Sequence, residues 1–119
     1  MPPQFGYVLR VVGASLLAVA PVVVAAVAVL AATGRLRRNS VAGIRIPSLY
    51  ASDAAWRIGH RAAVLPTVAA AVICVVLAVA ELVDPDFDVV GSILQTVVLI
   101  LGVLVGTALA SRAARAQSR

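Results

Sequence analysis

The side chains that could do chemistry in this 119-residue chain are few, and the rarest of them lie between positions 39 and 61. This segment holds the only Trp, Trp56, and the only His, His60. Nucleophilic catalysis needs a base beside an activated Ser or Cys, and an acid that orients the base. Asp53 precedes His60 by about two helical turns, which is too far for a side-chain pair. The pattern offers no catalytic group, and we expect no enzymatic activity.

The chain also lacks a set of residues that could bind a metal or a cofactor. A structural or catalytic metal site needs a set of ligands, and the chain has one His and one Cys. Cys74 lies inside an apolar run, where it is expected to be a small buried residue without a disulfide partner. Haem ligation through His60 would require a second subunit, and a lone His at this position is more often a polar anchor. We therefore expect no metal and no cofactor.

The composition around these residues indicates a membrane protein. Hydrophobic residues make up 62% of the chain and charged residues 13%, against about 45–50% and about 25% in soluble domains. Uncharged runs at 11–33, 62–80 and 89–110 have lengths suited to a hydrocarbon core of ~30 Å. Lipid offers the backbone no hydrogen-bond partner, so these runs must be helices. We predict an all-α integral membrane protein with three transmembrane helices, forming a single domain over residues 1–119.

Charge alternates between the segments that connect these spans. The loop 34–61 carries six arginines and one aspartate, the turn 81–88 carries four acidic residues, and the tail 111–119 carries three arginines. Short arginine-rich loops stay in the cytoplasm. We therefore predict a polar cytoplasmic loop between spans 1 and 2, a cytoplasmic C-terminus, and an N-terminus and an acidic turn outside. Together with Arg10, this distribution accounts for the net charge of +5, and we expect no direct nucleic-acid binding.

Four features of the spans bear on their retention in the membrane and on helix packing. The first span is too long for the apolar core of a signal peptide and is expected to remain as an uncleaved anchor. Gly102 and Gly106 form a GxxxG pattern, which lets helix backbones approach closely and which also arises by chance in a chain this rich in small residues. Gln95 is expected to face another helix, because lipid offers its amide no partner. Glu81, at the end of the second span, is expected to be a solvated cap.

The loop 34–61 divides into two parts. Residues 39–51 are predicted to be a non-helical link. A helix is predicted from Ser52 onward, because Ser52 can cap it and Asp53 suits the positive end of the helix dipole. Trp56 and His60 then share one face of this helix. Since Trp and Arg are typical of the membrane interface, the simplest interpretation is a surface anchor leading into the second span.

The rarer residues of the loop follow a longer pattern, N-x-x-x-G-I-R-x-P-x-x-x-x-S-D-x-x-W-x-x-x-H-R. This pattern resembles the loop of the SdpI family, which consists of small bacterial membrane proteins named after an immunity protein against a secreted, membrane-disrupting peptide toxin. Ile46 stands where family loops usually carry Thr. The resemblance implies a recognition loop, and the candidate partner-binding residues are Asn39, Gly43, Arg45, Pro47, Ser52, Asp53, Trp56, His60 and Arg61.

The resemblance also implies a role. Family members protect the cell from a peptide toxin, and the founding member signals by holding a transcriptional repressor at the membrane. In this hypothesis Arg45, Trp56 and His60 contact the partner, whereas Arg37 and Arg38 serve only the charge asymmetry.

Two other interpretations stay open. The protein could be an accessory subunit of a larger membrane complex, or a homo-oligomer, held together by its third span. It could also be a lipid-organising element whose arginines contact anionic headgroups. All three interpretations predict a multi-pass protein of the bacterial cell membrane.

Overall fold

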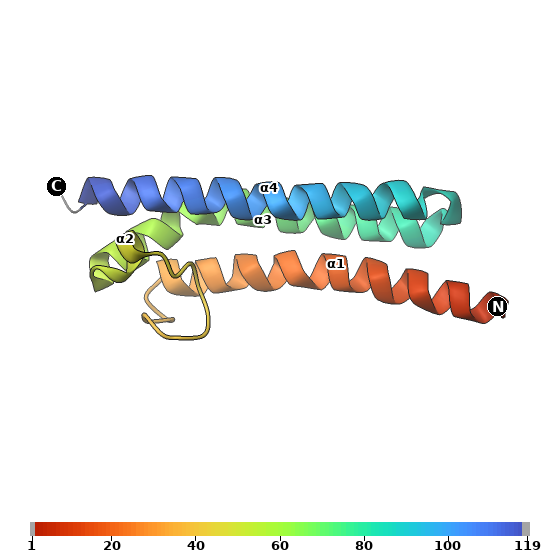
Figure 1. The fold of residues 1–119 in the computed structure, drawn as a ribbon, viewed down its shortest axis with the longest axis horizontal. Coiled ribbons are helices and arrows are strands. Elements are labelled where there is room, and N and C mark those ends of the chain that lie inside the picture. The colour runs from red at the N-terminus through yellow and green to blue at the C-terminus, as the bar shows by residue number, and fades with distance from the viewer. Residues whose placement is uncertain (1, 118–119) are drawn as a thin grey trace.

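The computed structural model describes residues 2–117, which form three long helices joined by a loop and a tight turn (Figure 1). Helix α1 spans Pro3–Ala32, α3 spans Asp53–Val83 and α4 spans Asp88–Gln117. A short helix, α2 (Pro47–Tyr50), lies within the loop, and a 3₁₀ turn, η1 (Pro85–Phe87), joins α3 to α4. No strand occurs among the described residues, which confirms the predicted all-α class.

All three long helices are long and apolar enough to cross a membrane, as predicted. Each of them extends beyond its predicted apolar run, because hydropathy marks the part that fits lipid and not the point where helical hydrogen bonding ends. The acidic turn predicted at 81–88 is correspondingly shorter. Only Asp84 and η1 separate α3 from α4, so these two helices form a hairpin.

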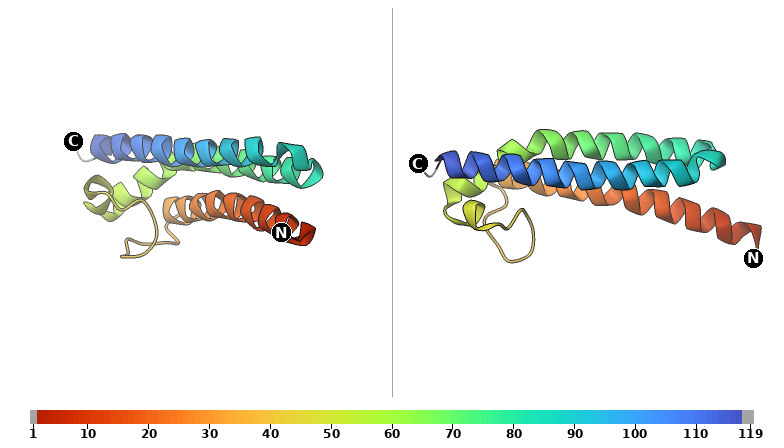
Figure 2. Two further views of the ribbon diagram at one scale, coloured as in Figure 1. Left: turned by 45° about the vertical axis from the view of Figure 1, so that its right-hand side comes forward. Right: turned by 45° about the horizontal axis from the view of Figure 1, so that its top comes forward.

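The helices pack as an elongated bundle of 58 × 21 × 19 Å. Helices α3 and α4 lie side by side along their length, and α1 packs mainly against α3 (Figures 1 and 2). The N-terminal end of α1 and the α3–α4 turn lie at one end of the bundle, and the loop and the C-terminal end of α4 lie at the other (Figure 1). Most of the buried hydrophobic residues are alanines, which allow helix backbones to approach closely.

Gly102 and Gly106 both face α3 of the same chain, and both are buried. A Cβ atom added to Gly102 would lie 2.6 Å from the Cβ of Ala70. A Cβ atom added to Gly106 would lie 3.2 Å from Cγ2 of Thr67. The two glycines therefore allow close packing within the hairpin, and contact with a second chain is not needed to account for them.

Gln95 lies buried where the three long helices meet. Its Nε2 donates a hydrogen bond to the Cys74 carbonyl of α3 at 2.9 Å and lies 3.5 Å from the Ala14 carbonyl of α1. The thiol of Cys74 is also buried, 3.5 Å from the backbone carbonyl of Gln95. The amide thus faces both other helices, as its polarity predicted.

Glu81 is not a solvated cap, so that expectation was wrong. Its side chain is fully buried between α3 and α4, and its Oε2 accepts a hydrogen bond from the Ser92 hydroxyl at 3.3 Å. A Cβ atom added to Gly91 would lie 2.6 Å from Oε1 of Glu81. The carboxyl group fits into the hairpin because Gly91 has no side chain and because α3 continues to Val83.

Candidate functional site

The chain leaves α1 through a turn that carries it toward the start of α3. Gly34 has a φ angle of +81°, the left-handed conformation with which helices commonly end. The N–H of Leu36 donates back to the Leu30 carbonyl at 3.0 Å. The Leu36 carbonyl in turn accepts a hydrogen bond of 2.9 Å from Nε1 of Trp56. The end of α1 is thereby fixed to the first turns of α3.

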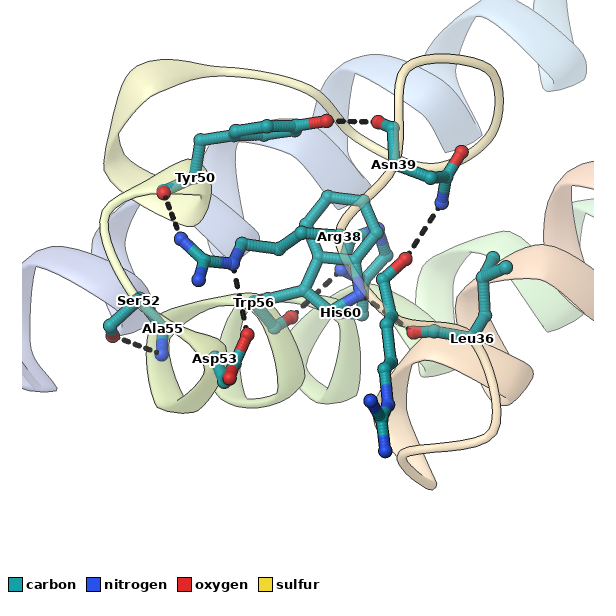
Figure 3. Close-up of polar contacts among 10 residues, drawn as sticks. Leu36, Arg38, Asn39, Tyr50, Ser52, Asp53, Ala55, Trp56 and His60 are labelled. Carbon is teal, nitrogen blue, oxygen red and sulfur yellow. Dashed lines mark hydrogen bonds and ion pairs between the residues drawn. The ribbon is translucent and has the colours of Figure 1, made fainter.

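Asn39 folds the next part of the loop. Its Oδ1 accepts hydrogen bonds from the N–H groups of Val41 (2.9 Å) and Ala42 (2.7 Å), and its Nδ2 donates to the Arg37 carbonyl at 2.7 Å. This is the arrangement by which asparagine side chains stabilise turns. The Tyr50 hydroxyl donates to the Asn39 backbone carbonyl (Figure 3). The polar atoms of this asparagine side chain are therefore engaged within the loop.

Trp56 and His60, near the start of α3, form the core against which the loop packs. Their side chains are 1% and 0% exposed, and their ring centroids lie 4.2 Å apart. Nε2 of His60 accepts a hydrogen bond from the Ile44 N–H at 2.9 Å, so Nδ1 carries the ring proton and donates to the Trp56 carbonyl at 2.8 Å. Both nitrogens of a neutral imidazole are thus used to hold the loop against α3.

Gly43 packs directly on this pair of rings. Its φ angle is +109°, which side chains other than glycine rarely adopt. A Cβ atom added to it would lie 2.5 Å from Cη2 of Trp56 and 3.1 Å from Nε2 of His60. The position therefore demands glycine both for its backbone conformation and for its closeness to the tryptophan ring.

Arg38 joins the loop to the start of α3 (Figure 3). Its Nε donates to Oδ1 of Asp53 at 2.9 Å, and its Nη1 donates to the Tyr50 carbonyl at 2.8 Å. Our expectation that Arg38 serves only the charge asymmetry was wrong. Its two partners lie fifteen and twelve residues away, and no local spacing rule connects them. The Asp53 carboxylate is 78% exposed, so the ion pair adds little stability, but it aligns the two segments.

The segment 39–51 is not wholly non-helical, because α2 occupies Pro47–Tyr50. Proline suits the first turn of a helix, where its missing N–H is not needed. Leu49 is fully buried and packs on Gly59, where an added Cβ would lie 2.6 Å from its Cγ. The Ser52 hydroxyl accepts a hydrogen bond from the Ala55 N–H at 3.0 Å, which confirms the predicted cap of α3.

A small apolar core lies beneath the loop and joins it to all three long helices. It takes one residue from the end of α1, Leu49 from α2, three from the start of α3 and two from the end of α4. The loop therefore packs against the end of the whole bundle and is not merely tethered to it. The members are Ala31, Leu49, Ala55, Trp56, Ala63, Ala110 and Ala114, with Leu36, Ile44 and Ile46 packed around them.

The nine predicted loop residues therefore separate into two groups. In the first group, Gly43 packs on the buried Trp56 and His60 of α3. The turn-forming Asn39 and the capping residue Ser52 belong to this group as well. Trp56 does not present its ring to the membrane surface, as a surface anchor would. The residues that the structure leaves exposed are Arg45, Pro47, Asp53 and Arg61.

Sequence reasoning missed four positions that shape the site. Arg38 and Tyr50 connect its segments, and Leu49 and Gly59 pack α2 on α3. Of the four, Gly59 carried a sequence signal, since a glycine inside a predicted helix lowers its helix propensity and leaves room for another segment to pack closely.

Arg45 is one of these exposed residues and lies in the segment between the Asn39 turn and α2. Its Nη1 donates to the Ser40 carbonyl at 2.6 Å. It forms no ion pair within residues 2–117, where Arg38 and Asp53 make the single salt bridge. Val41, at the tip of the same turn, is 84% exposed. A rigid loop thus displays an unpaired cation beside an apolar side chain.

Fold and loop together define a class: a small multi-pass helical membrane protein whose first two long helices are joined by a structured polar loop. The model of the SdpI/YfhL protein family matches residues 35–111, which include the loop and the α3–α4 hairpin. The chain therefore belongs to the SdpI/YfhL family. Comparison with curated proteins and with solved structures gives no match.

Proposed function

We propose that this protein is an SdpI-like recognition protein of the bacterial cell membrane, which gives immunity against a membrane-active peptide toxin or transmits a signal through the loop. The observation that carries the proposal is the internal order of the loop. A surface anchor needs only an aromatic residue and positive charge near the interface. A buried Trp56–His60 pair, a glycine with positive φ and an asparagine-folded turn serve instead to hold one surface in one conformation.

The recognition surface in this proposal is centred on Arg45. Family resemblance alone suggested that Trp56 and His60 also contact the partner, but their burial leaves them no surface to offer. They act as the framework that positions Arg45 and Val41. A guanidinium group can form planar, bidentate hydrogen bonds with a carboxylate or phosphate, which an ammonium group cannot reproduce.

Arg45→Lys tests this role. Loss of one charge-assisted hydrogen bond, about 1.5–3 kcal/mol, would weaken partner binding roughly ten- to a hundredfold. A toxin-sensitive bacterium producing each variant is challenged with the secreted, membrane-disrupting peptide that the immunity protein of the family's name protects against. The wild type and Arg37→Lys, whose side chain is exposed, are expected to protect the cells. Arg45→Lys is expected to lose most of this protection at an unchanged membrane level.

Three outcomes would count against the proposal. Equal protection by all variants would mean that a positive charge at position 45 is sufficient for protection and that the guanidinium group itself is not required. No protection by the wild type would remove the immunity role and leave signalling, which recovery of a repressor with the protein would then support. Co-purification of the protein with a large membrane assembly, through α4 and without dependence on Arg45, would favour an accessory subunit.

We further propose that the loop and the C-terminal end of α4 face the cytoplasm. The loop 34–61, with its six arginines, and the C-terminal end of α4, with Arg112 and Arg115, lie at one end of the bundle, and the acidic α3–α4 turn lies at the other. Positively charged short loops are retained inside.

Reporter fusions test this orientation. A reporter that is active only outside the cytoplasm is expected to be silent when fused after residue 119 and active when inserted beside Asp86. The reverse pattern would invert the orientation and place the loop on the outer surface.

A further inference from the structure

A cavity of about 630 Å³ lies beneath the loop, between α1 and α4. Val24 and Val27 of α1 form one wall, Val103 and Thr107 of α4 form the other, and residues 41–46 form the roof. Its volume falls within the roughly 300–1,000 Å³ typical of small-molecule sites. Val23 and Val103, at its edge, are 53% and 40% exposed, so the cavity opens on the outer surface of the bundle.

The interior of this cavity suits hydrocarbon. Its back wall contains His60 and Thr67, but their polar atoms already have partners. Nε2 of His60 accepts from the Ile44 N–H at 2.9 Å, and the Thr67 hydroxyl donates to the Ala63 carbonyl at 2.7 Å. The walls formed by α1 and α4 consist of valine and alanine side chains, apart from Thr107. A polar ligand would be desolvated there with little compensation.

The rim of the cavity carries a cation. Arg45 lines the cavity, is exposed to solvent, and has no carboxylate partner within residues 2–117. An apolar cavity with an unpaired guanidinium at its edge complements a molecule that has a hydrocarbon chain and an anionic head. In a membrane, anionic phospholipids have this structure, and arginines near the headgroups attract them.

We propose that the cavity binds one acyl chain of an anionic phospholipid whose phosphate group contacts Arg45. The bound lipid would fill the space between α1 and α4 and support the roof of the loop. This site goes beyond the proposed recognition function and does not depend on it, since lipid binding can be measured without toxin or repressor.

Trp56 provides the measurement, because it is the only tryptophan in the chain. Its ring lies behind two cavity-lining residues, with its centroid 4.2 Å from that of His60 and its edge against Gly43. Bromine atoms on an acyl chain inside the cavity would quench its fluorescence. The full-length protein is reconstituted in phosphatidylcholine vesicles that contain increasing mole fractions of either brominated phosphatidylglycerol or brominated phosphatidylcholine.

The anionic bromolipid is expected to quench at a concentration about fivefold lower than the zwitterionic one, the factor that corresponds to about 1 kcal/mol per arginine. Arg45→Gln is expected to abolish this difference. Arg37→Gln removes the same charge from an exposed position outside the cavity and is expected to retain it. Val24→Phe, which narrows the cavity, is expected to reduce quenching by both lipids.

Equal quenching by the two lipids in the wild type would mean that only the ordinary lipid surrounding the protein reaches Trp56, and would overturn the proposal. An unchanged preference in Arg45→Gln would do the same. A shift of the Trp56 emission by Arg45→Gln in vesicles without bromolipid would mean that this substitution disturbs the loop itself. In that case Val24→Phe tests the site, and unaltered quenching in that variant would show that the acyl chain does not enter the cavity. Loss of toxin protection with intact lipid preference would affect the recognition proposal alone.

Discussion

Replacing Gly43 with alanine is expected to displace the loop from α3 while leaving the three long helices intact. The new Cβ atom would lie 2.5 Å from the Trp56 ring, which is 1% exposed and has no free space to move into. Overpacking of this kind typically costs about 1–3 kcal/mol, and a positive φ angle at a residue other than glycine adds to it. The emission of Trp56 should shift to longer wavelength as the ring meets water, and trypsin should cleave the loop at its arginines more rapidly.

Gly34→Ala is the matched control for this experiment. Its φ angle of +81° is also left-handed, but an added Cβ would meet only Cδ of Arg57 at an ordinary 3.7 Å. This variant therefore carries the backbone strain without the clash, and should show a smaller change in emission and cleavage. If the two variants behave alike, backbone conformation and not packing on Trp56 makes Gly43 necessary. Wild-type emission in Gly43→Ala would refute the described core.

Gly102→Leu is expected to weaken the α3–α4 hairpin more than any other substitution in the spans that we consider. Its Cβ atom would lie 2.6 Å from that of Ala70, so the two backbones must separate. The cost should reach the upper part of the about 1–3 kcal/mol range for overpacked cores. Gly106→Leu meets Thr67 at 3.2 Å and should cost about 1 kcal/mol. Thermal unfolding in detergent, followed by circular dichroism, gives the order of the two midpoints.

Gly13→Leu controls for the change in hydrophobicity. Gly13 lies in α1, and an added Cβ has no neighbour within 4 Å. Its midpoint should stay near that of the wild type. If the unfolding midpoint of Gly102→Leu is also that of the wild type, the glycines of α4 do not mark the hairpin contact. Their spacing would then be a chance result of a composition rich in small residues.

The parts of the fold that depend on local chemistry could be predicted from sequence. Three uncharged runs define three spans because lipid imposes both length and helicity. The Ser52 cap is local as well, since its hydroxyl bonds an N–H three residues later. The hairpin also follows from the short connection between the second and third apolar runs.

The remaining features depend on partners distant in sequence. Trp56 flanked by arginines fits a membrane interface and a protein core equally well, and the choice is made by the Leu36 carbonyl, twenty residues away. The role of Arg38 depends on Asp53 and Tyr50, which the fold of α2 and the start of α3 bring close to it. The burial of Glu81 depends on Gly91 of the next helix. These contacts join residues that are distant in sequence, so neither composition nor local spacing predicts them.

The amide of Gln95 has a consequence for how the hairpin is aligned. The facing surfaces of α3 and α4 are built largely from Ala and Gly, so a slide of one turn, about 5.4 Å, would exchange one small-residue contact for another of similar size. Such a slide would also remove the amide from the Cys74 carbonyl to which it donates at 2.9 Å, and an unpaired buried amide costs about 1–3 kcal/mol. The Gln95 amide therefore acts together with the buried Glu81, which fits against Gly91 and accepts from Ser92, to select a single register. That register places Ala110 and Ala114 of α4 in the apolar core beneath the loop. The buried Gln95 amide therefore also contributes to the packing that supports the loop.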